Sequence, residues 1–174
     1  AVGGGGVGVQ GDDITANPGS NKQACAALDA FASDGANKGV TDAWNQHYSV
    51  IKAANLITES ASKAPVAQDK IDVALGNAHF WRAYAYYYLV RVFGPVPLIT
   101  GTDVSQLEVA PSSVEKVYEL IVSDLKAAVN ELPTKYEKEP SRLFGVDIWS
   151  TKQAAQATLS AVYMSMAGYP LNKG

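Results

Sequence analysis

The sequence has few of the residues that form cross-links and metal sites. Cys25 is the only cysteine, which excludes an internal disulfide and a multi-cysteine metal site. We expect Cys25 to be a small buried or neutral residue. The two histidines, His47 and His79, fall on different expected helices, and neither has a carboxylate beside it in sequence. We expect both to be structural or surface residues, and we expect no bound metal or cofactor.

Concentrated charge and long apolar runs are also missing. The 14 Lys and Arg residues are outnumbered by 17 Asp and Glu residues, and no long basic cluster occurs. Nucleic acid binding, which needs a concentrated basic face, is therefore not expected. The longest apolar run, residues 83–90, is too short to span a bilayer. Any signal peptide is expected to have been removed or to lie upstream of residue 1.

The composition is that of a globular protein, with 47% hydrophobic and 18% charged residues. Residues 1–11 contain six glycines and cannot hold a helix or strand unaided. Residues 12–40 are rich in Asp, Asn, Gly, Ser and Ala, which predicts a long polar loop with one helical turn at residues 22–31. We therefore expect a Gly-rich start and polar loop over residues 1–40 and a helical region over residues 41–174.

The helical region begins with two long stretches. The first covers residues 41–60, with Thr41 as the expected N-cap. Its apolar positions keep helical spacing, with Asn55 as the exception: Trp44, Tyr48, Ile51 and Leu56. The second covers residues 66–93 and ends at the run Gly94-Pro95-Val96-Pro97, because glycine suits the position past a helix end and proline cannot continue the helix.

Two further helices are expected towards the end of the chain. One opens at Ser112, with Glu115 completing a capping box, and closes before Pro133. Its apolar stripe consists of Val117, Leu120, Ile121, Leu125, Ala128 and Leu132. The other covers residues 151–167 and ends at Gly168-Tyr169-Pro170. Its inward positions are expected to be Ala155, Leu159, Val162, Tyr163 and Met166.

The helix over residues 66–93 concentrates the aromatic residues. Seven of them lie within residues 80–93: Phe80, Trp81, Tyr84, Tyr86, Tyr87, Tyr88 and Phe93. At 3.6 residues per turn they point in nearly every direction, which predicts an enclosed helix with Trp81 in the core. The buried tyrosine hydroxyls then need polar partners. Helices with Trp, Tyr and Ala in alternation indicate an all-α, tetratricopeptide-like fold, although no strict repeat of about 34 residues is present.

Several motifs resemble catalytic or cofactor sites but lack the required context. Residues 6–11 match G-x-G-x-x-G, yet only five residues precede them and Asp12-Asp13 follow. Ser-x-x-Lys occurs repeatedly, for example at Ser60–Lys63, Ser113–Lys116 and Ser123–Lys126, without the companion motifs of penicillin-recognising enzymes. Nothing around Asp12-Asp13 indicates the apolar surroundings that raise a carboxyl pKa, so solvated loop carboxylates are favoured over an acid/base pair. We expect no enzyme activity.

Four segments, in order, share one pattern. Residues 77–98 read N-A-H-F-W-R-A-Y-A-Y-Y-Y-L-V-R-V-F-G-P-V-P-L, residues 44–55 fit W-x-x-x-Y-x-x-I-x-x-A-N, and residues 114–133 contain V-Y-E-L-I-V-S-D-L-K. Residues 151–171 provide the fourth segment. Together they strongly resemble the SusD/RagB family, whose members carry A-x-F-x-R-A-x-x-Y-x-x-L-V-x-x-F-G-x-V-P-L on their second tetratricopeptide-like helix.

The resemblance implies an incomplete SusD-like α-helical fold, because family members are typically much longer. It also implies a non-catalytic lipoprotein on the extracellular face of a Gram-negative, Bacteroidetes-like outer membrane. Such a protein binds an oligosaccharide, or sometimes a peptide, and delivers it to a SusC-like TonB-dependent transporter. The only membrane attachment expected is an N-terminal lipid anchor on a cysteine upstream of residue 1, so Cys25 is not that cysteine.

In this family the ligand contacts come from loops above the helical scaffold. The candidates in the loop of residues 12–40 are hydrogen-bonding side chains: Asp12, Asp13, Asn17 and Asn21. An equally good interpretation is that they form turns and helix caps. Trp149, in the loop before the last helix, is a candidate stacking platform if it is exposed. Trp44 is expected in the core rather than at the ligand.

Two other kinds of function remain open. A tetratricopeptide-like scaffold that binds a protein partner and no small ligand is the main alternative, and a concave groove lined by Tyr and Asn would favour it. A glycosidase ranks third, because it needs two carboxylates about 5–10 Å apart across a cleft. The sequence does not identify the glycan or the oligomeric state.

Overall fold

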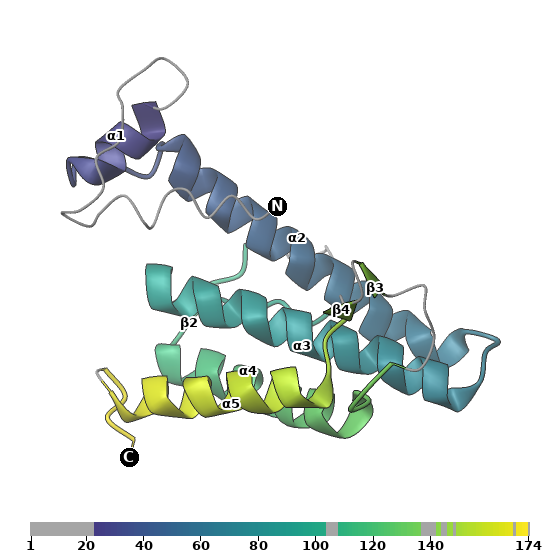
Figure 1. Ribbon diagram of the computed structural model, residues 1–174. Coiled ribbons are helices and arrows are strands. Elements are labelled where there is room, and N and C mark those ends of the chain that lie inside the picture. Colours follow the sequence, from purple (N-terminus) through teal and green to yellow (C-terminus); the bar gives the residue numbers. More distant parts are fainter. Residues whose placement is uncertain are drawn as a thin grey trace. The chain divides into compact units, whose positions relative to one another are not determined.

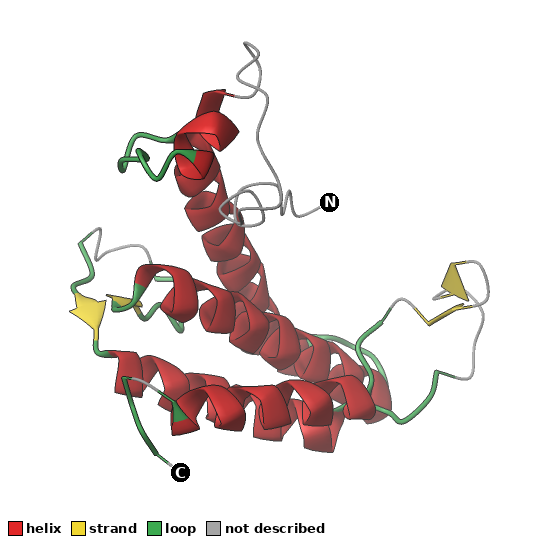
Figure 2. Ribbon diagram, turned by 60° about the vertical axis from the view of Figure 1, so that its left-hand side comes forward, coloured by secondary structure: helices red, strands yellow, loops and turns green. Residues whose placement is uncertain are grey.

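The structure, a computed structural model, describes residues 23–103, 108–136, 142–143, 146–147, 149–168 and 170–173. Helices dominate this part of the chain, and the strands are only two residues long (Figure 2). The α-helices are α1 (Gln23–Asp29), α2 (Lys38–Ser60), α3 (Gln68–Phe93), α4 (Val114–Glu131) and α5 (Lys152–Ala167). A 3₁₀ turn, η2 (Ala61–Lys63), follows α2. The all-α prediction is confirmed.

The strands form two small antiparallel pairs that the sequence analysis did not predict. Strand β1 (Val96–Pro97) pairs with β2 (Pro111–Ser112), with Val96 opposite Ser112. Strand β3 (Arg142–Leu143) pairs with β4 (Val146–Asp147), with Arg142 opposite Asp147. The first pair joins the two ends of the connection between α3 and α4, and the second lies within the connection between α4 and α5. Each pair lies within a single helix connection and leaves the fold class unchanged.

The chain divides into two compact units, residues 1–49 and residues 50–174, and each is described by itself. In the first unit, Asn37 caps α2: its Oδ1 accepts hydrogen bonds from the backbone N of Gly39 at 2.9 Å and of Val40 at 3.4 Å. Its Nδ2 donates to the Ala24 carbonyl at 3.0 Å, which ties α1 to the start of α2. The predicted cap, Thr41, was wrong, because its hydroxyl donates back to the carbonyl of Asn37 inside the first turn.

In the second unit, α4 packs against both α3 and α5 (Figure 1). Its predicted apolar stripe forms most of its buried face, and only Leu120 is partly exposed. The fully buried apolar side chains of this unit come from four helices and β1: Ile51, Ala83, Tyr86, Leu89, Val96, Val117, Ile121, Leu125, Ala128, Ala155 and Val162. Burying each large one stabilises the fold by about 1.5–3 kcal/mol.

Local signals set the ends of these helices. Gly94 ends α3 at φ 73°, a left-handed conformation that glycine adopts without strain, and its N–H bonds to the Val90 carbonyl. Thr151, the predicted first residue of the last helix, is the N-cap of α5, since its hydroxyl accepts from the backbone N of Ala154. The predicted capping box at Ser112 was wrong. Ser113 is the cap of α4, with its hydroxyl accepting from Lys116 N, and the Glu115 carboxylate pairs with Lys173 instead.

Gly76 of α3 lies where α3 meets the end of α4. A Cβ placed on Gly76 would lie 2.9 Å from Cγ of Leu132 and 3.0 Å from Cβ of Glu131. Real Cβ atoms hardly ever come that close to another carbon, so the absence of a side chain at this position allows the two segments to approach. The close approach brings the start of α3 against the end of α4.

The prediction that α3 is enclosed on all sides was wrong. Phe80, Tyr86 and Tyr87 are buried, but Trp81 is 45% exposed and Tyr84 46% exposed. With the half-buried Tyr88 and the 46% exposed Val92 they form one strip along the helix, called here the outer stripe. Aromatic side chains in many directions therefore do not require a partner on every face: inward ones fill the core and outward ones pack on each other, with the Trp81 and Tyr84 ring centroids 5.8 Å apart.

Two other predicted core positions are also on the surface. Leu56 of α2 is 59% exposed and Tyr163 of α5 is 44% exposed. Each lies beside a buried position of its helix, Asn55 and Val162 respectively. The inward faces are therefore narrower than predicted, since Ile51 on α2 and Ala155 and Val162 on α5 are buried as expected. Trp44, expected in the core, is half-buried, with its ring centroid 4.9 Å from that of Tyr48.

Candidate functional site

A buried ion pair joins α3 to α4. The Arg82 guanidinium donates from Nε to Asp124 Oδ2 at 2.7 Å and from Nη2 to Oδ1 at 2.8 Å. The two side chains are 9% and 5% exposed. This bidentate arrangement is the strong form of the contact, because two parallel charge-assisted hydrogen bonds share one plane. Burial alone would lower the pKa of Arg82, but the hydrogen bonds and charge of Asp124 outweigh it and raise that pKa.

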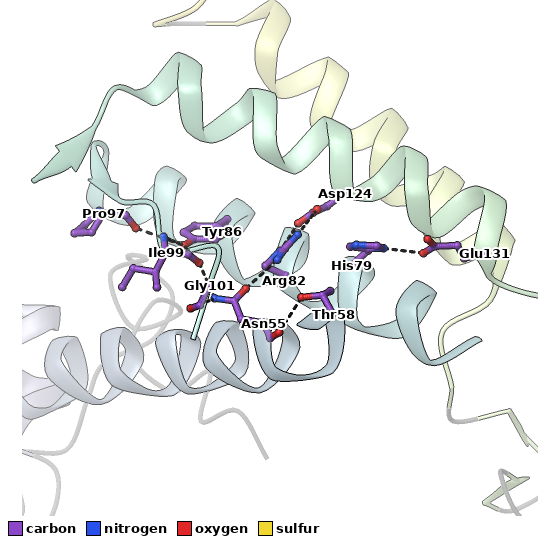
Figure 3. Close-up of polar contacts among 10 residues, drawn as sticks. All are labelled: Asn55, Thr58, His79, Arg82, Tyr86, Pro97, Ile99, Gly101, Asp124 and Glu131. Atoms are coloured by element: carbon purple, nitrogen blue, oxygen red, sulfur yellow. Dashed lines mark hydrogen bonds and ion pairs between the residues drawn. The ribbon is translucent and has the colours of Figure 1, made fainter. Parts of the chain in front are cut away.

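The same guanidinium contacts α2. Arg82 Nη1 donates to Oδ1 of Asn55 at 2.9 Å, and Asn55 is fully buried (Figure 3). The Asn55 Nδ2 then donates to the carbonyls of Ile99 at 2.9 Å and Gly101 at 3.1 Å. A chain of hydrogen bonds thus runs from a carboxylate on α4, through α3 and α2, to the backbone that follows β1.

Tyr86 and Glu59 hold the same backbone. The Tyr86 hydroxyl accepts from Ile99 N at 2.7 Å and lies 3.2 Å from the Ile99 carbonyl, to which it donates. Burial of this phenol raises its pKa to about 12. The Glu59 carboxylate accepts from Thr102 N at 2.8 Å and from the Thr102 hydroxyl. These hydrogen bonds lower the pKa of Glu59, because they favour the charged carboxylate.

The two histidines each lie close to an oxygen atom. His79 Nδ1 lies 2.7 Å from Oε2 of Glu131, so the carboxylate that His79 lacks in sequence comes from α4. His47 is buried, with Nδ1 2.6 Å from the Ala43 carbonyl of its own helix. Within the described ranges, no group of three or more His, Cys, Asp or Glu side chains could hold a metal ion. The His79–Glu131 pair joins α3 to α4, and the His47 contact lies within α2.

The three side chains that form this chain of hydrogen bonds come from three of the four shared sequence segments. Asn55 is the N of W-x-x-x-Y-x-x-I-x-x-A-N, Arg82 follows Phe80-Trp81, and Asp124 is the D of V-Y-E-L-I-V-S-D. A model of the SusD-like family, described as "Starch-binding associating with outer membrane", matches residues 10–164. The chain belongs to the SusD-like family. The helices that carry the family pattern in the sequence are thus the helices of a SusD-like fold.

Similar proteins and solved structures support this family assignment. The SusD-like protein P2 of Formosa agariphila is 32% identical over 139 residues, which are 78% of this chain and 26% of the relative. The chain therefore spans about a quarter of the length of that relative. A structure solved with a xylogluco-oligosaccharide is 27% identical, with a TM-score of 0.69, covering 85% of this chain and 28% of that one. A laminarin-binding SusD-like protein has a TM-score of 0.76 at 22% identity, covering 88% and 32%, and shares the fold.

The predicted ligand residues of this SusD-like chain are only partly described. Asp12, Asp13, Asn17 and Asn21 lie outside the described residues, so their role stays a prediction, as does their grouping with Trp149. Trp149 is 51% exposed, which meets the condition set for a stacking role. Its neighbour Ser150 is buried and accepts at its carbonyl from the Tyr136 hydroxyl at 2.7 Å. That hydroxyl accepts from Asn77 Nδ2 at 3.3 Å, which ties the chain beside Trp149 to α3.

Asn55, Arg82 and Asp124 belong to the shared sequence pattern, but no role was predicted for them. One signal was available: Asn55 interrupts an otherwise apolar helix face. A buried polar residue on such a face needs a partner. Arg82 and Asp124, on the next two long helices, are suitable candidates. Among the described helices, none is long and apolar enough to cross a membrane.

Proposed function

We propose that this chain is part of a non-catalytic cell-surface protein that captures an oligosaccharide for import. The observation that carries the proposal is the match of residues 10–164 to a family described as starch-binding and associated with the outer membrane. The relative solved with a xylogluco-oligosaccharide supports a glycan ligand over a peptide. Capture needs only weak binding, with Kd from micromolar to millimolar or about −8 to −4 kcal/mol, because the ligand must also be released.

The proposed ligand contacts are Asp12, Asp13, Asn17 and Asn21, which precede α1 in the sequence, and Trp149. Sugar rings stack on aromatic faces, while Asp and Asn side chains hydrogen-bond to their hydroxyls. Trp149 supplies an exposed indole beside the anchored Ser150. Asp12, Asp13, Asn17 and Asn21 supply the polar groups. The division into a Gly-rich start and polar loop (residues 1–40) and a helical scaffold (residues 41–174) is part of the same proposal.

The remaining parts of the proposal come from the family. We propose that the protein is held on the extracellular face of the outer membrane by a lipid anchor and passes its ligand to a SusC-like TonB-dependent transporter. Co-purification of the full-length protein with the transporter tests this partnership. Recovery of the protein without any transporter, after mild detergent extraction, would count against it.

Affinity electrophoresis of the full-length protein against a panel of polysaccharides, including xyloglucan and laminarin, tests the ligand class. Two tryptophans of similar exposure form a matched pair, Trp149 at 51% and Trp81 at 45%. We expect Trp149→Ala to lose retardation by the bound glycan with an unchanged Tm, and Trp81→Ala to keep it. Equal retardation of wild type and Trp149→Ala would remove Trp149 from the site.

One observation favours a second candidate, a scaffold that binds a protein partner. The outer stripe of α3 places Trp81, Tyr84 and Val92 at the surface, and exposed aromatic side chains in a row are common at protein interfaces. This candidate predicts no retardation on any polysaccharide. It also predicts loss of a co-purifying protein in the variant Trp81→Ala/Tyr84→Ala.

A further inference from the structure

The backbone that follows β1 accepts and donates several hydrogen bonds to side chains of neighbouring helices. This segment, residues 98–102, is called here the strap. Side chains from two helices bind its backbone. Asn55 from α2 and Tyr86 from α3 are two of them (Figure 3). Glu59 from α2 is the third. They contact an N–H or carbonyl at Ile99, Gly101 and Thr102. Since a connection on a protein surface normally bonds to water, this many side-chain bonds requires an explanation.

The hydrogen bonds to Asn55 have a fixed direction. A guanidinium has only donors, so the Asn55 atom that faces Arg82 must be the acceptor Oδ1. The amide nitrogen must then face the other way, towards the carbonyls of Ile99 and Gly101, which accept only. A carboxamide free to rotate could present either atom to the strap. The charge on Arg82, held by Asp124, removes that choice.

A buried ion pair could instead serve only to join α3 and α4. That explanation is weak on energetic grounds, because apolar side chains of similar volume often stabilise a fold as well as a buried pair does. An apolar pair could not orient a neighbouring amide, however. We propose that Arg82 is a positioning residue: through Asn55 it fixes the path of the strap. This role does not depend on which ligand the protein binds.

A nearly isosteric substitution tests the direction of the chain. Asn55→Asp keeps an acceptor towards Arg82 but places a carboxylate oxygen against two carbonyls, where repulsion replaces two hydrogen bonds. In the full-length protein we expect amide hydrogen exchange at Ile99 and Thr102 to become at least about tenfold faster, while the middle of α3 and α4 stays protected. The matched control is Asn45→Asp, which makes the same change at an exposed position of the same helix. Unchanged exchange in the strap of Asn55→Asp would overturn the proposal.

A second variant separates positioning from stabilisation. Arg82→Met/Asp124→Leu replaces the ion pair by apolar side chains and leaves Asn55 without its orienting donor. We expect a folded protein, by circular dichroism, in which the strap still exchanges at least about tenfold faster than in wild type. Wild-type protection of the strap in this variant would mean that the pair only joins the helices. If the variant does not fold, the Asn55→Asp comparison decides the question.

Discussion

The inner face of α3 buries polar groups among its apolar side chains, whereas the outer stripe leaves aromatic and apolar side chains exposed. The inner face buries a guanidinium and a phenol hydroxyl, Arg82 and Tyr86, and every one of these polar groups has a partner. The outer stripe leaves Trp81, Tyr84 and Val92 nearly half exposed. Arg82 and Tyr86 are buried with partners for their polar groups, while the side chains of the outer stripe stay at the surface where no described segment covers them. Residue type alone therefore does not decide which face of this helix is buried.

The largest effect is expected on the inner face. Asp124→Ala leaves the Arg82 guanidinium buried without its counter-charge, and such a loss costs about 3–5 kcal/mol of unfolding free energy. Chemical denaturation measures this cost. Glu119→Ala, at an exposed position of α4, is the control and should change stability by less than about 0.5 kcal/mol. A similar, small cost for both variants would mean that the inner face does not need its ion pair.

A smaller effect is expected one turn along the same face. Tyr86→Phe removes the hydroxyl that binds Ile99 and leaves buried backbone groups unpaired, at a cost of about 1–3 kcal/mol. The control, Tyr84→Phe, removes a hydroxyl from the outer stripe and should be neutral. Thermal unfolding of the two variants compares the faces directly. Equal melting temperatures would show that the Tyr86 hydroxyl contributes nothing to the fold.

The outer stripe itself should be nearly neutral to truncation. Trp81→Ala is expected to cost less than about 1 kcal/mol, because the indole is 45% exposed and its removal leaves no closed cavity. Its sequence neighbour Phe80 is 7% exposed, and Phe80→Ala should cost about 3–5 kcal/mol. Denaturant midpoints measure both. A loss at Trp81 as large as that at Phe80 would place the outer stripe in the core after all.

The smallest effect is expected for the pH dependence of the exposed hydrogen bond between Glu59 and Thr102. The pKa of Glu59 is lowered from 4.5, so its bond to Thr102 is fully present above pH 4.5 and is lost as the pH falls through the lower, folded value. The amide proton shift of Thr102 should therefore titrate with a midpoint below 4.5, and not at all in Glu59→Gln. A midpoint at or above 4.5 would contradict the carboxylate hydrogen bond. Arg82 and Asn55 should hold Ile99 and Gly101 unchanged through this range.

The helix ends were largely predictable from sequence because the signals are local. Gly94, Pro133 and Thr151 mark ends that the structure confirms to within two residues. Where two caps competed, the prediction failed by a few residues: Ser113 rather than Ser112, and Asn37 rather than Thr41. Adjacent serines fit the same pattern, and only the geometry of the first turn distinguishes them.

The site was less predictable because it is made by contacts between helices. Each of Asn55, Arg82 and Asp124 is visible in the sequence, but their meeting requires three helices at particular rotations. The prediction that Trp81 lies in the core was wrong for a related reason. Periodicity indicates which residues share a helix face, but not which faces are covered by other segments. Trp149 is exposed, which was the condition for a stacking role, and that role stays a prediction.

The missing side chain at Gly76 has a consequence beyond packing. A single methyl group there would act as a wedge against both Leu132 and Glu131, at 2.9 and 3.0 Å. Glu131 is also the carboxylate that holds His79, three residues along α3. A methyl group that displaced Glu131 would therefore also disturb the contact between Glu131 and His79. Packing and charge at the start of α3 therefore both depend on a hydrogen atom standing where any other residue has a carbon.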